Sequence, residues 1–328
     1  MLVAGFELRE MRRSKRALAV VALYLMVAAF LAFVFVHLLQ QAQTVVTNPV
    51  GLISGANAPG QGGPNGPGGP RGPRGPVFAP SPVDKPSQGL FFSRRSPFRA
   101  VLRNQVSDDE TMDFLVVQPP ITLFYLLTSF MFVPFLIMIT AAETVAQEHQ
   151  SRGVRFVAMR TGRAEFVLGK VLGQGLLVAV VTLLAGLMSL TVAAWNLADF
   201  SWGPALSSLL LFWPRVVAYT VPFVGLAALC SMATNSTMAA RAGALLGLGG
   251  LWLVHQAPTI YANSALALRT NGALAPVFNA LDYISPYAYQ DDLWRPQWNE
   301  IGTPILLLAW LGVIYVGVGL FFYRRRDL

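Results

Sequence analysis

Six long apolar segments constrain this chain more than any other feature of its sequence. They cover approximately residues 17–39, 121–141, 168–194, 206–230, 239–256 and 304–323. Each is close to the roughly 20 apolar residues that a helix needs to cross the hydrocarbon core of a bilayer. Because lipid offers no hydrogen-bonding partner, the backbone must satisfy itself, and solidly apolar segments do so as helices. The sequence therefore predicts an all-α polytopic membrane protein with six transmembrane helices.

The composition of the chain favours the same class. Hydrophobic residues make up 54% of the 328 residues and charged residues only 12%, roughly half the charged fraction of a soluble domain. The first apolar segment is longer than the core of about 7–15 residues in a signal peptide, and no A-x-A-like cleavage site follows it before Gln40. We therefore expect this segment to remain as the first transmembrane helix.

Basic residues are distributed unevenly along the chain. They precede the first segment, lie between the second and third, and follow the sixth, whereas the link 195–204 contains none. Because short loops rich in Lys and Arg stay in the cytoplasm, both termini are predicted to be cytoplasmic, in a multi-pass protein of the cytoplasmic (inner) membrane. This topology explains the net charge of +8 without nucleic-acid binding. The residues concerned are Arg9, Arg12, Arg13, Lys15, Arg16, Arg152, Arg155, Arg160, Arg163, Lys170, Arg324, Arg325 and Arg326.

Several segments lie outside the spans. Residues 1–16 mix basic and apolar side chains, which predicts a cytoplasmic interfacial helix. Residues 40–120 form a large external loop whose centre, 55–76, is almost entirely Gly and Pro, so we expect either a disordered tether or a docking arm for a periplasmic or cell-envelope partner. Residues 257–303 are rich in Tyr and Trp and form an external segment with re-entrant or interfacial pieces. Residues 304–328 form the sixth transmembrane helix and a basic cytoplasmic tail.

The chain lacks the motifs of common enzymes. The phosphate-binding pattern GxxxxGK[ST] is absent, so ATP is not bound by that device. His37, His149 and His255 are far apart and Cys230 is the single cysteine, so no zinc site is expected. We predict no catalytic residue, no metal and no cofactor in this chain, which is therefore not expected to be an enzyme.

A few residues within the apolar segments are candidates for a pathway or a gate. Arg215 is toward the outer end of the fourth segment; it either snorkels to the interface or faces a pathway and pairs with an acidic group. Pro134 and Pro222 remove backbone N–H groups from the second and fourth segments and are expected to kink them. These kinks are either purely structural or permit gating.

Residues 121–256 hold transmembrane helices two to five, with a polar cytoplasmic hairpin over 142–170 between the second and third. Glu148 precedes Arg152 by four residues, a favourable spacing for an ion pair on a helix. If residues 152–160 are helical, Arg152, Arg155 and Met159 share one face and apolar residues occupy the other. The hairpin is either a docking surface for a cytosolic partner or a charged loop that only sets the topology.

The hairpin pattern E-x-x-x-R-G, followed by G-R-x-E-x-x-x-G-K, resembles the loop between the second and third helices of ABC-2 type permeases. Residues 6–16 are similar to the family's interfacial elbow helix, Ser285-Pro286 to a dipeptide before its last helix, and the ending FFYRRRDL to its Arg-rich tail. Within the family, the chain resembles the branch of the nitrous-oxide-reductase maturation and gliding-motility permeases. The matching hairpin positions are Glu148, Arg152, Gly153, Arg163, Glu165, Gly169 and Lys170.

The resemblance implies the permease subunit of an ATP-binding-cassette exporter. The hairpin of such permeases docks into a separate ATP-binding subunit, of which two copies would hold ATP and Mg, and a second permease subunit, identical or different, would complete the complex. Two alternatives stay open: an ion-coupled secondary transporter, and a non-transporting anchor that recruits a partner through residues 40–120. The implied ATPase-coupling residues are Glu148, Arg152, Gly153, Arg155, Met159, Arg163, Glu165 and Lys170.

Overall fold

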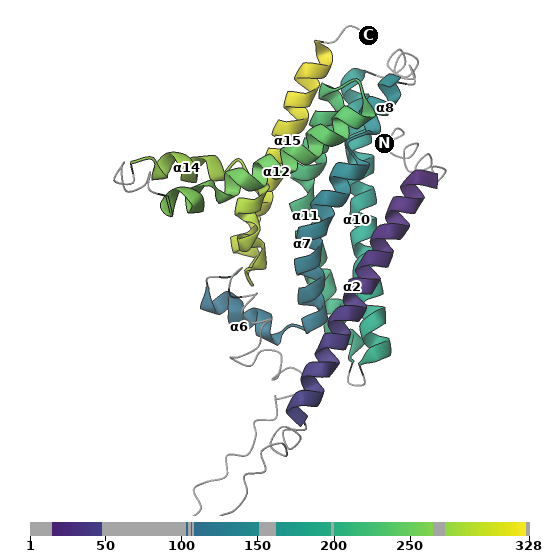
Figure 1. The fold of residues 1–328 in the computed structure, drawn as a ribbon, viewed down its shortest axis with the longest axis vertical. Helices are drawn as coiled ribbons and strands as arrows, with labels where there is room; N and C mark the ends of the chain where they lie inside the picture. The colour runs from purple at the N-terminus through teal and green to yellow at the C-terminus, as the bar shows by residue number, and fades with distance from the viewer. Residues whose placement is uncertain are drawn as a thin grey trace, which may run out of the picture.

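The computed structural model describes residues 15–47, 103, 106, 108–150, 162–197, 200–264 and 273–325. Within these ranges the regular structure is entirely helical. Six stretches are long and apolar enough to cross a bilayer, and Figure 1 shows how they are arranged. The predicted all-α class with six membrane-spanning helices is therefore confirmed.

The long helices extend past most of the apolar segments that predicted them. All except α7 begin earlier and end later than those segments, because polar residues continue each helix beyond its apolar centre. A short helix, α8, follows α7 after the turn at residues 141–143 and belongs to the second span. The helices are α2 (Lys15–Thr47), α7 (Pro120–Thr140), α8 (Thr144–Gln150), α10 (Arg163–Asn196), α11 (Trp202–Ala233), α12 (Thr237–Ala262) and α15 (Trp298–Arg324).

Shorter elements precede α7 and connect α12 to α15. They are α6 (Asp109–Val117), α14 (Ala275–Asp282), η1 (Pro286–Tyr289) and η2 (Asp291–Trp294). Helix α6 forms inside the segment expected to be a loop because Asp108 caps it, accepting a hydrogen bond of 3.2 Å from the backbone N–H of Thr111. The Gly-Pro stretch 55–76 and most of the expected interfacial helix 1–16 lie outside the described residues.

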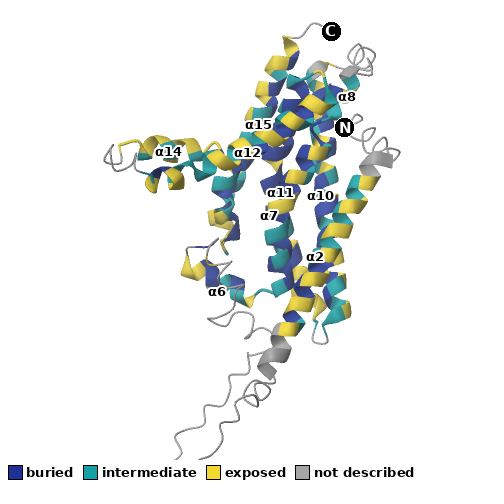
Figure 2. Cartoon of the chain, viewed as in Figure 1, coloured by how far each residue is buried: buried dark blue, intermediate teal, exposed yellow. Residues whose placement is uncertain are grey.

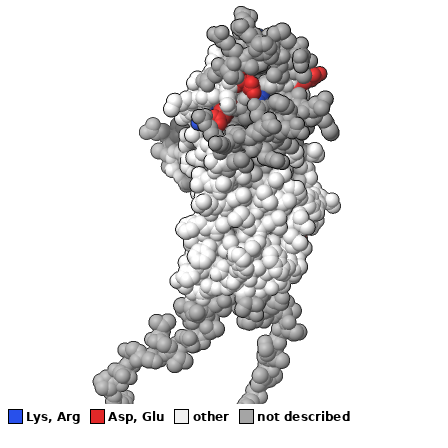
Figure 3. Space-filling view, turned by 90° about the vertical axis from the view of Figure 1, so that its right-hand side faces the viewer, with Lys and Arg blue, Asp and Glu red and all other residues white. Residues whose placement is uncertain are grey.

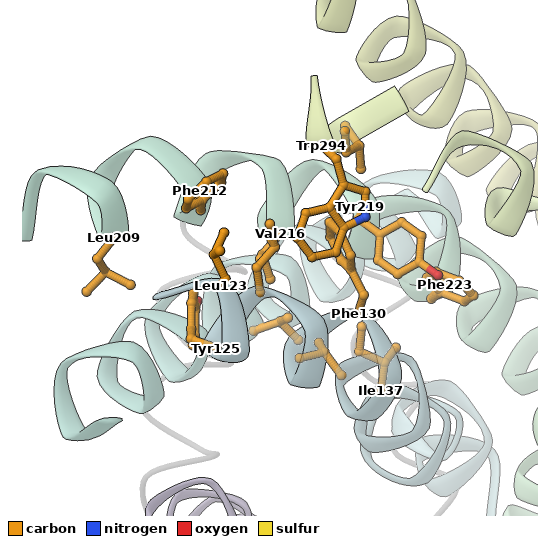
Figure 4. Close-up of a cluster of buried hydrophobic side chains, with 14 of the residues drawn as sticks. Leu123, Tyr125, Phe130, Ile137, Leu209, Phe212, Val216, Tyr219, Phe223 and Trp294 are labelled. Atoms are coloured by element: carbon orange, nitrogen blue, oxygen red, sulfur yellow. The ribbon is translucent and has the colours of Figure 1, made fainter. Parts of the chain in front are cut away.

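The centre of the bundle is formed mainly by α7 and α11, whose spans have the largest buried shares, 61% and 67%, and Figure 2 shows the buried surface along them. An aromatic cluster joins them to η2 (Figure 4). The ring of Phe130 in α7 lies 4.7 Å from that of Tyr219 and 5.7 Å from that of Trp294. Because such rings bury large apolar areas and prefer tilted or edge-on contacts, this cluster fixes η2 against the two central helices.

Helices α11 and α15 pack closely through glycines. A Cβ atom on Gly225 would lie 2.7 Å from the backbone oxygen of Gly312, and one on Gly312 would lie 2.8 Å from the side chain of Val221. Neither position leaves space for a side chain. Since helices in lipid associate by close van der Waals packing rather than by a hydrophobic driving force, these glycines let α15 join the bundle.

The outer surface of the bundle is apolar. In the view of Figure 3, the wide middle of the described surface carries no Lys, Arg, Asp or Glu, and the visible charges gather at the end that carries α8. Many large apolar side chains are exposed, among them Phe30 in α2, Leu172 in α10 and Trp310 in α15. Such a belt suits contact with lipid tails. The beginning of α2 and the end of α15 lie toward the α8 end as well (Figure 1).

Helices α12 and α14 form an arm. Figure 1 shows α12 crossing the bundle obliquely, with its last turns and α14 extending away from the other helices. Two contacts hold α14 against α12. The rings of Tyr261 and Phe278 lie 4.8 Å apart, and His255 Nδ1 lies 2.9 Å from Asp282 Oδ1. We call α12 from Gly249 onward, together with α14, the arm.

Candidate functional site

The first turn of α8 is held by a side chain from another helix. The backbone N–H groups of Val145 and Ala146 both donate to Ser231 Oγ of α11, each at 3.0 Å. The first N–H groups of a helix have no partner within that helix, and Ser231, which is fully buried, supplies the acceptor. The start of α8 is therefore fixed to α11.

An ion pair holds the other end of α8. Glu148 Oε1 lies 3.3 Å from Lys170 Nζ of α10. The Lys170 side chain is only 5% exposed and its ammonium also lies over the ring of Phe166, 5.1 Å from the ring centroid. Because a charge that is nearly buried needs a partner, the carboxylate of Glu148 ties α8 to α10.

A third link runs to α12. The carboxylate of Glu143, in the turn that leads into α8, accepts a hydrogen bond from the guanidinium of Arg241. Both side chains are partly exposed, 23% for Glu143 and 43% for Arg241. This pair joins the beginning of α8 to the first turns of α12.

Apolar contacts complete the attachment. Val145 of α8 packs in a small buried cluster with residues of α10, α11 and α15, which is separate from the larger core. Its other buried members are Phe166, Val167, Ala228, Met232, Val316 and Tyr323. Helix α8 is thus joined to α10, α11 and α12 at one end of the bundle, and it shares this cluster with α15. We refer to these contacts together as the α8 anchor.

The predicted coupling residues are described only in part. The structure brings Glu148 and Lys170 together, a pairing that the sequence did not predict. Glu165 is exposed in the first turn of α10, and Gly169 is buried. Arg163 is the first residue of α10, but its side chain lies outside the description. Arg152, Gly153, Arg155 and Met159 also lie outside the described residues, so the Glu148–Arg152 pair stays a prediction.

The roles of three members of the anchor, Ser231, Glu143 and Arg241, were missed from the sequence. Ser231 gave no signal, because a lone serine in an apolar span is common and its acceptor role depends on where α8 begins. Glu143 and Arg241 were recognisable as charges at the ends of two spans. Their pairing required knowing that α12 returns to α7 at this end.

The expectation that Arg215 snorkels to the interface is wrong. Its side chain is completely buried, near the middle of α11, and no carboxylate of the described residues forms an ion pair with it. Instead its Nη1 donates to the carbonyl oxygens of Leu293 and Arg295. Pro134 and Pro222 lie inside α7 and α11, and both are buried.

The described residues contain no cluster of His, Cys, Asp or Glu that could hold a metal ion. The prediction that the chain holds no metal or cofactor remains a prediction, because part of the chain lies outside the description.

Comparisons with known proteins agree with the arrangement of the spans. A search of curated proteins gave no match. The family model described as "ABC-2 family transporter protein" matches residues 1–328, the whole chain. Six membrane-spanning helices fit a permease, the membrane component of an ABC transporter that works with an ATP-binding subunit. The chain therefore belongs to the ABC-2 family of transporter proteins.

Proposed function

We propose that this permease is the transmembrane subunit of an ABC exporter and that α8 carries motion from a separate ATP-binding subunit into the bundle. The segment that follows α8, residues 151–161, resembles the docking part of the coupling hairpin. ATP-driven closure of the partner would push this segment and, through it, α8.

One observation carries the proposal: α8 is bonded to α10, α11 and α12 at the same time. A loop that only sets topology needs no such bonds. Two hydrogen bonds to Ser231, the Glu148–Lys170 pair and the Glu143–Arg241 pair mean that α8 cannot shift alone. A push on α8 would be shared among three spanning helices, which is what coupling to transport requires.

The test separates docking from transmission. The permease is co-expressed with the ATP-binding subunit, and both co-purification and the ATPase rate of the complex are measured. Arg155→Glu and Met159→Asp should abolish or weaken co-purification, because a docking surface loses its complementarity. Ser231→Ala should leave co-purification intact but change the ATPase rate of the complex several-fold.

The matched control is Ser207→Ala, an exposed serine on the same helix whose hydroxyl bonds only within its own turn. It should behave as the wild type in both measurements. If the docking variants and Ser231→Ala all leave assembly and ATP turnover unchanged, the hairpin only sets topology. An ion-coupled transporter or a passive membrane anchor would then be favoured.

We also propose that the second permease subunit is another copy of this chain and that it packs against the arm. The arm exposes apolar side chains on both of its helices, including Trp252, Ile260 and Val277. Added Cβ atoms on Gly249 and Gly250 would meet nothing within 4 Å, so another helix can approach there closely. In a Cys230→Ser background, Gly250→Cys should give disulfide-linked dimers, whereas Gly317→Cys on α15 should not.

The likeness to the nitrous-oxide-reductase maturation and gliding-motility branch stays a prediction. So do the two copies of the ATP-binding subunit, the placement of both termini in the cytoplasm, and the location in the inner membrane.

A further inference from the structure

A guanidinium group is sealed inside the bundle, far from the α8 anchor. Arg215 has no exposed side-chain surface. At a rise of about 1.5 Å per residue it lies roughly 20 Å from the first residue of α11 and roughly 27 Å from the last. It therefore lies well inside α11, level with the beginning of α15, where its guanidinium faces the ring of Trp298, and a buried positive charge there is costly.

The guanidinium is only partly satisfied. Its Nη1 donates to the carbonyl oxygens of Leu293 at 3.0 Å and Arg295 at 2.8 Å. Its Nε and Nη2 are buried and have no hydrogen-bond partner among the described residues. The rings of Phe212 and Trp298 flank it, with their centroids 5.2 and 5.4 Å from Cζ. They contribute cation–π attraction but no acceptor.

A second buried donor, in the segment that covers Arg215, also has no partner among the described residues. The indole Nε1 of Trp294 is buried and meets no acceptor within the described part of the chain. Trp294 is the residue between the two that supply carbonyl oxygens to Arg215, and its ring lies edge-on to Phe130. Figure 4 shows this indole inside the aromatic cluster. Three buried nitrogens of these two side chains thus lack acceptors among the described residues, although few buried polar groups in proteins lack a partner.

The segment that covers Arg215 packs along one face of α11. Arg215, Tyr219 and Phe223 are spaced by four residues and lie on the same side of the helix. Arg215 contacts the end of η2, the hydroxyl of Tyr219 donates to Gln290 Oε1 at 3.3 Å, and Phe223 lies edge-on to Tyr287, 5.6 Å away. Residues 287–295 therefore close over this face, and an outward shift of residues 291–295 would uncover the guanidinium.

The chemistry of the uncovered groups is that of an anion receptor. Arg offers five N–H donors and no acceptor, and its planar fork matches the two oxygens of a carboxylate or a phosphate. The carboxylate of Asp292, in the segment that covers Arg215, is engaged with Arg295 at 2.9 Å. Within the described residues, the acceptors of the Arg215 guanidinium are two backbone carbonyls.

We propose that Arg215 and Trp294 form a binding site for an oxyanion, a carboxylate or phosphate group, which residues 291–295 close in this conformation. When that segment shifts outward far enough to withdraw its two carbonyl oxygens, an anionic group enters between the fork of Arg215 and the indole N–H of Trp294, which moves with the segment. As a site for cargo it rests on the proposed transport function. The binding itself requires only the permease.

The test uses the full-length permease alone, in nanodiscs of phosphatidylcholine. Inorganic phosphate is titrated while the thermal midpoint and the tryptophan fluorescence are followed, with chloride at matched ionic strength as the control for screening. In a second arm, phosphatidylglycerol replaces part of the lipid. A saturable response to phosphate identifies a soluble anion, and a response to phosphatidylglycerol alone identifies a lipid headgroup.

We expect Arg215→Lys, which keeps the charge but loses the fork, to weaken the response at least about 10-fold, and Arg215→Gln to abolish it. Trp294→Phe, which keeps an aromatic ring but loses the N–H, should weaken it several-fold. Arg324→Gln removes an exposed arginine at the end of α15 and should respond as the wild type.

Two results would overturn the site: no response to either probe, or responses that are equal in wild type, Arg215→Lys and Trp294→Phe. If Arg215→Gln fails to fold, Arg215→Lys and Trp294→Phe still test whether the site binds the anion. The result is separable from the coupling proposal because no ATP-binding subunit is present. Ser231→Ala, which alters the α8 anchor, should leave anion binding unchanged.

Discussion

Glu148 of α8 and Lys170 of α10 form an ion pair of 3.3 Å across the base of the predicted coupling hairpin. The lysine is almost entirely buried, whereas about a quarter of the glutamate side chain remains exposed. The ion pair therefore stabilises the lysine more than the glutamate, because only the lysine side chain has lost most of its hydration. This asymmetry predicts different effects of removing each partner.

Glu148→Gln should destabilise the protein more than Lys170→Met. The first change leaves a buried ammonium with a weaker partner and should cost about 1–3 kcal/mol, while the second replaces it by an apolar side chain of similar length. The thermal midpoint of the purified protein measures both. Asp109→Asn, an exposed carboxylate in the first turn of α6, is the matched control. Equal losses for the two anchor variants would contradict the asymmetry.

Packing between α11 and α15 should tolerate no methyl group at Gly225. The added Cβ would lie 2.7 Å from a backbone oxygen of Gly312, so the helices themselves would have to separate. Gly225→Ala should cost about 1–3 kcal/mol. Gly317→Ala in α15 meets nothing within 4 Å and should be neutral or slightly stabilising, since Ala favours helix. Thermal unfolding of the two variants checks the prediction, which fails if both behave alike.

The stability of the protein should fall as the pH rises from about 4 to about 6. Loss of surrounding water raises the pKa of Asp291 to about 6; the charge of His255 opposes this shift, and Asp292 and Asp282 reinforce it. The folded protein then binds more protons than the unfolded chain between the ordinary pKa of 3.8 and 6. The free energy of unfolding therefore decreases across that window and levels off above it.

Asp291→Asn should remove this part of the pH dependence, and its thermal midpoint should exceed that of the wild type at pH 7. Asp291 is exposed to solvent, which weakens the effect of its local environment on the pKa, so the gain is expected to be small. Asp109→Asn should keep the wild-type profile. An unchanged slope between pH 4 and 6 in Asp291→Asn would show that other groups produce the pH dependence.

The sequence predicted the spans well because one physical term, the cost of exposing a backbone to lipid, determines them. It could not predict contacts between spans. From its place in the apolar segment, Arg215 could be expected to snorkel to the interface. Instead, the carbonyl oxygens of Leu293 and Arg295, 78 and 80 positions later in the chain, accept its hydrogen bonds. Ser231 likewise gains its role only through α8, 85 and 86 residues earlier. Such long-range pairings depend on how helices cross, which apolar periodicity does not encode.

The last prediction concerns the link between α8 and α12. Glu143 and Arg241 are partly exposed, so their ion pair should contribute less than about 1 kcal/mol to stability. Single reversals, Glu143→Arg or Arg241→Glu, should therefore change the thermal midpoint little but should lower the ATPase rate of the assembled complex, because α8 and α12 would repel each other.

The double variant Glu143→Arg/Arg241→Glu restores opposite charges at the same two positions. If the pair transmits motion between α8 and α12, the double variant should recover a large part of the ATPase rate that each single variant loses. Co-purification with the ATP-binding subunit should be unchanged in all three, since the pair lies behind the predicted docking surface. A double variant no better than the singles would mean that these residues act separately, and that α12 receives its movement through α11 rather than directly from α8.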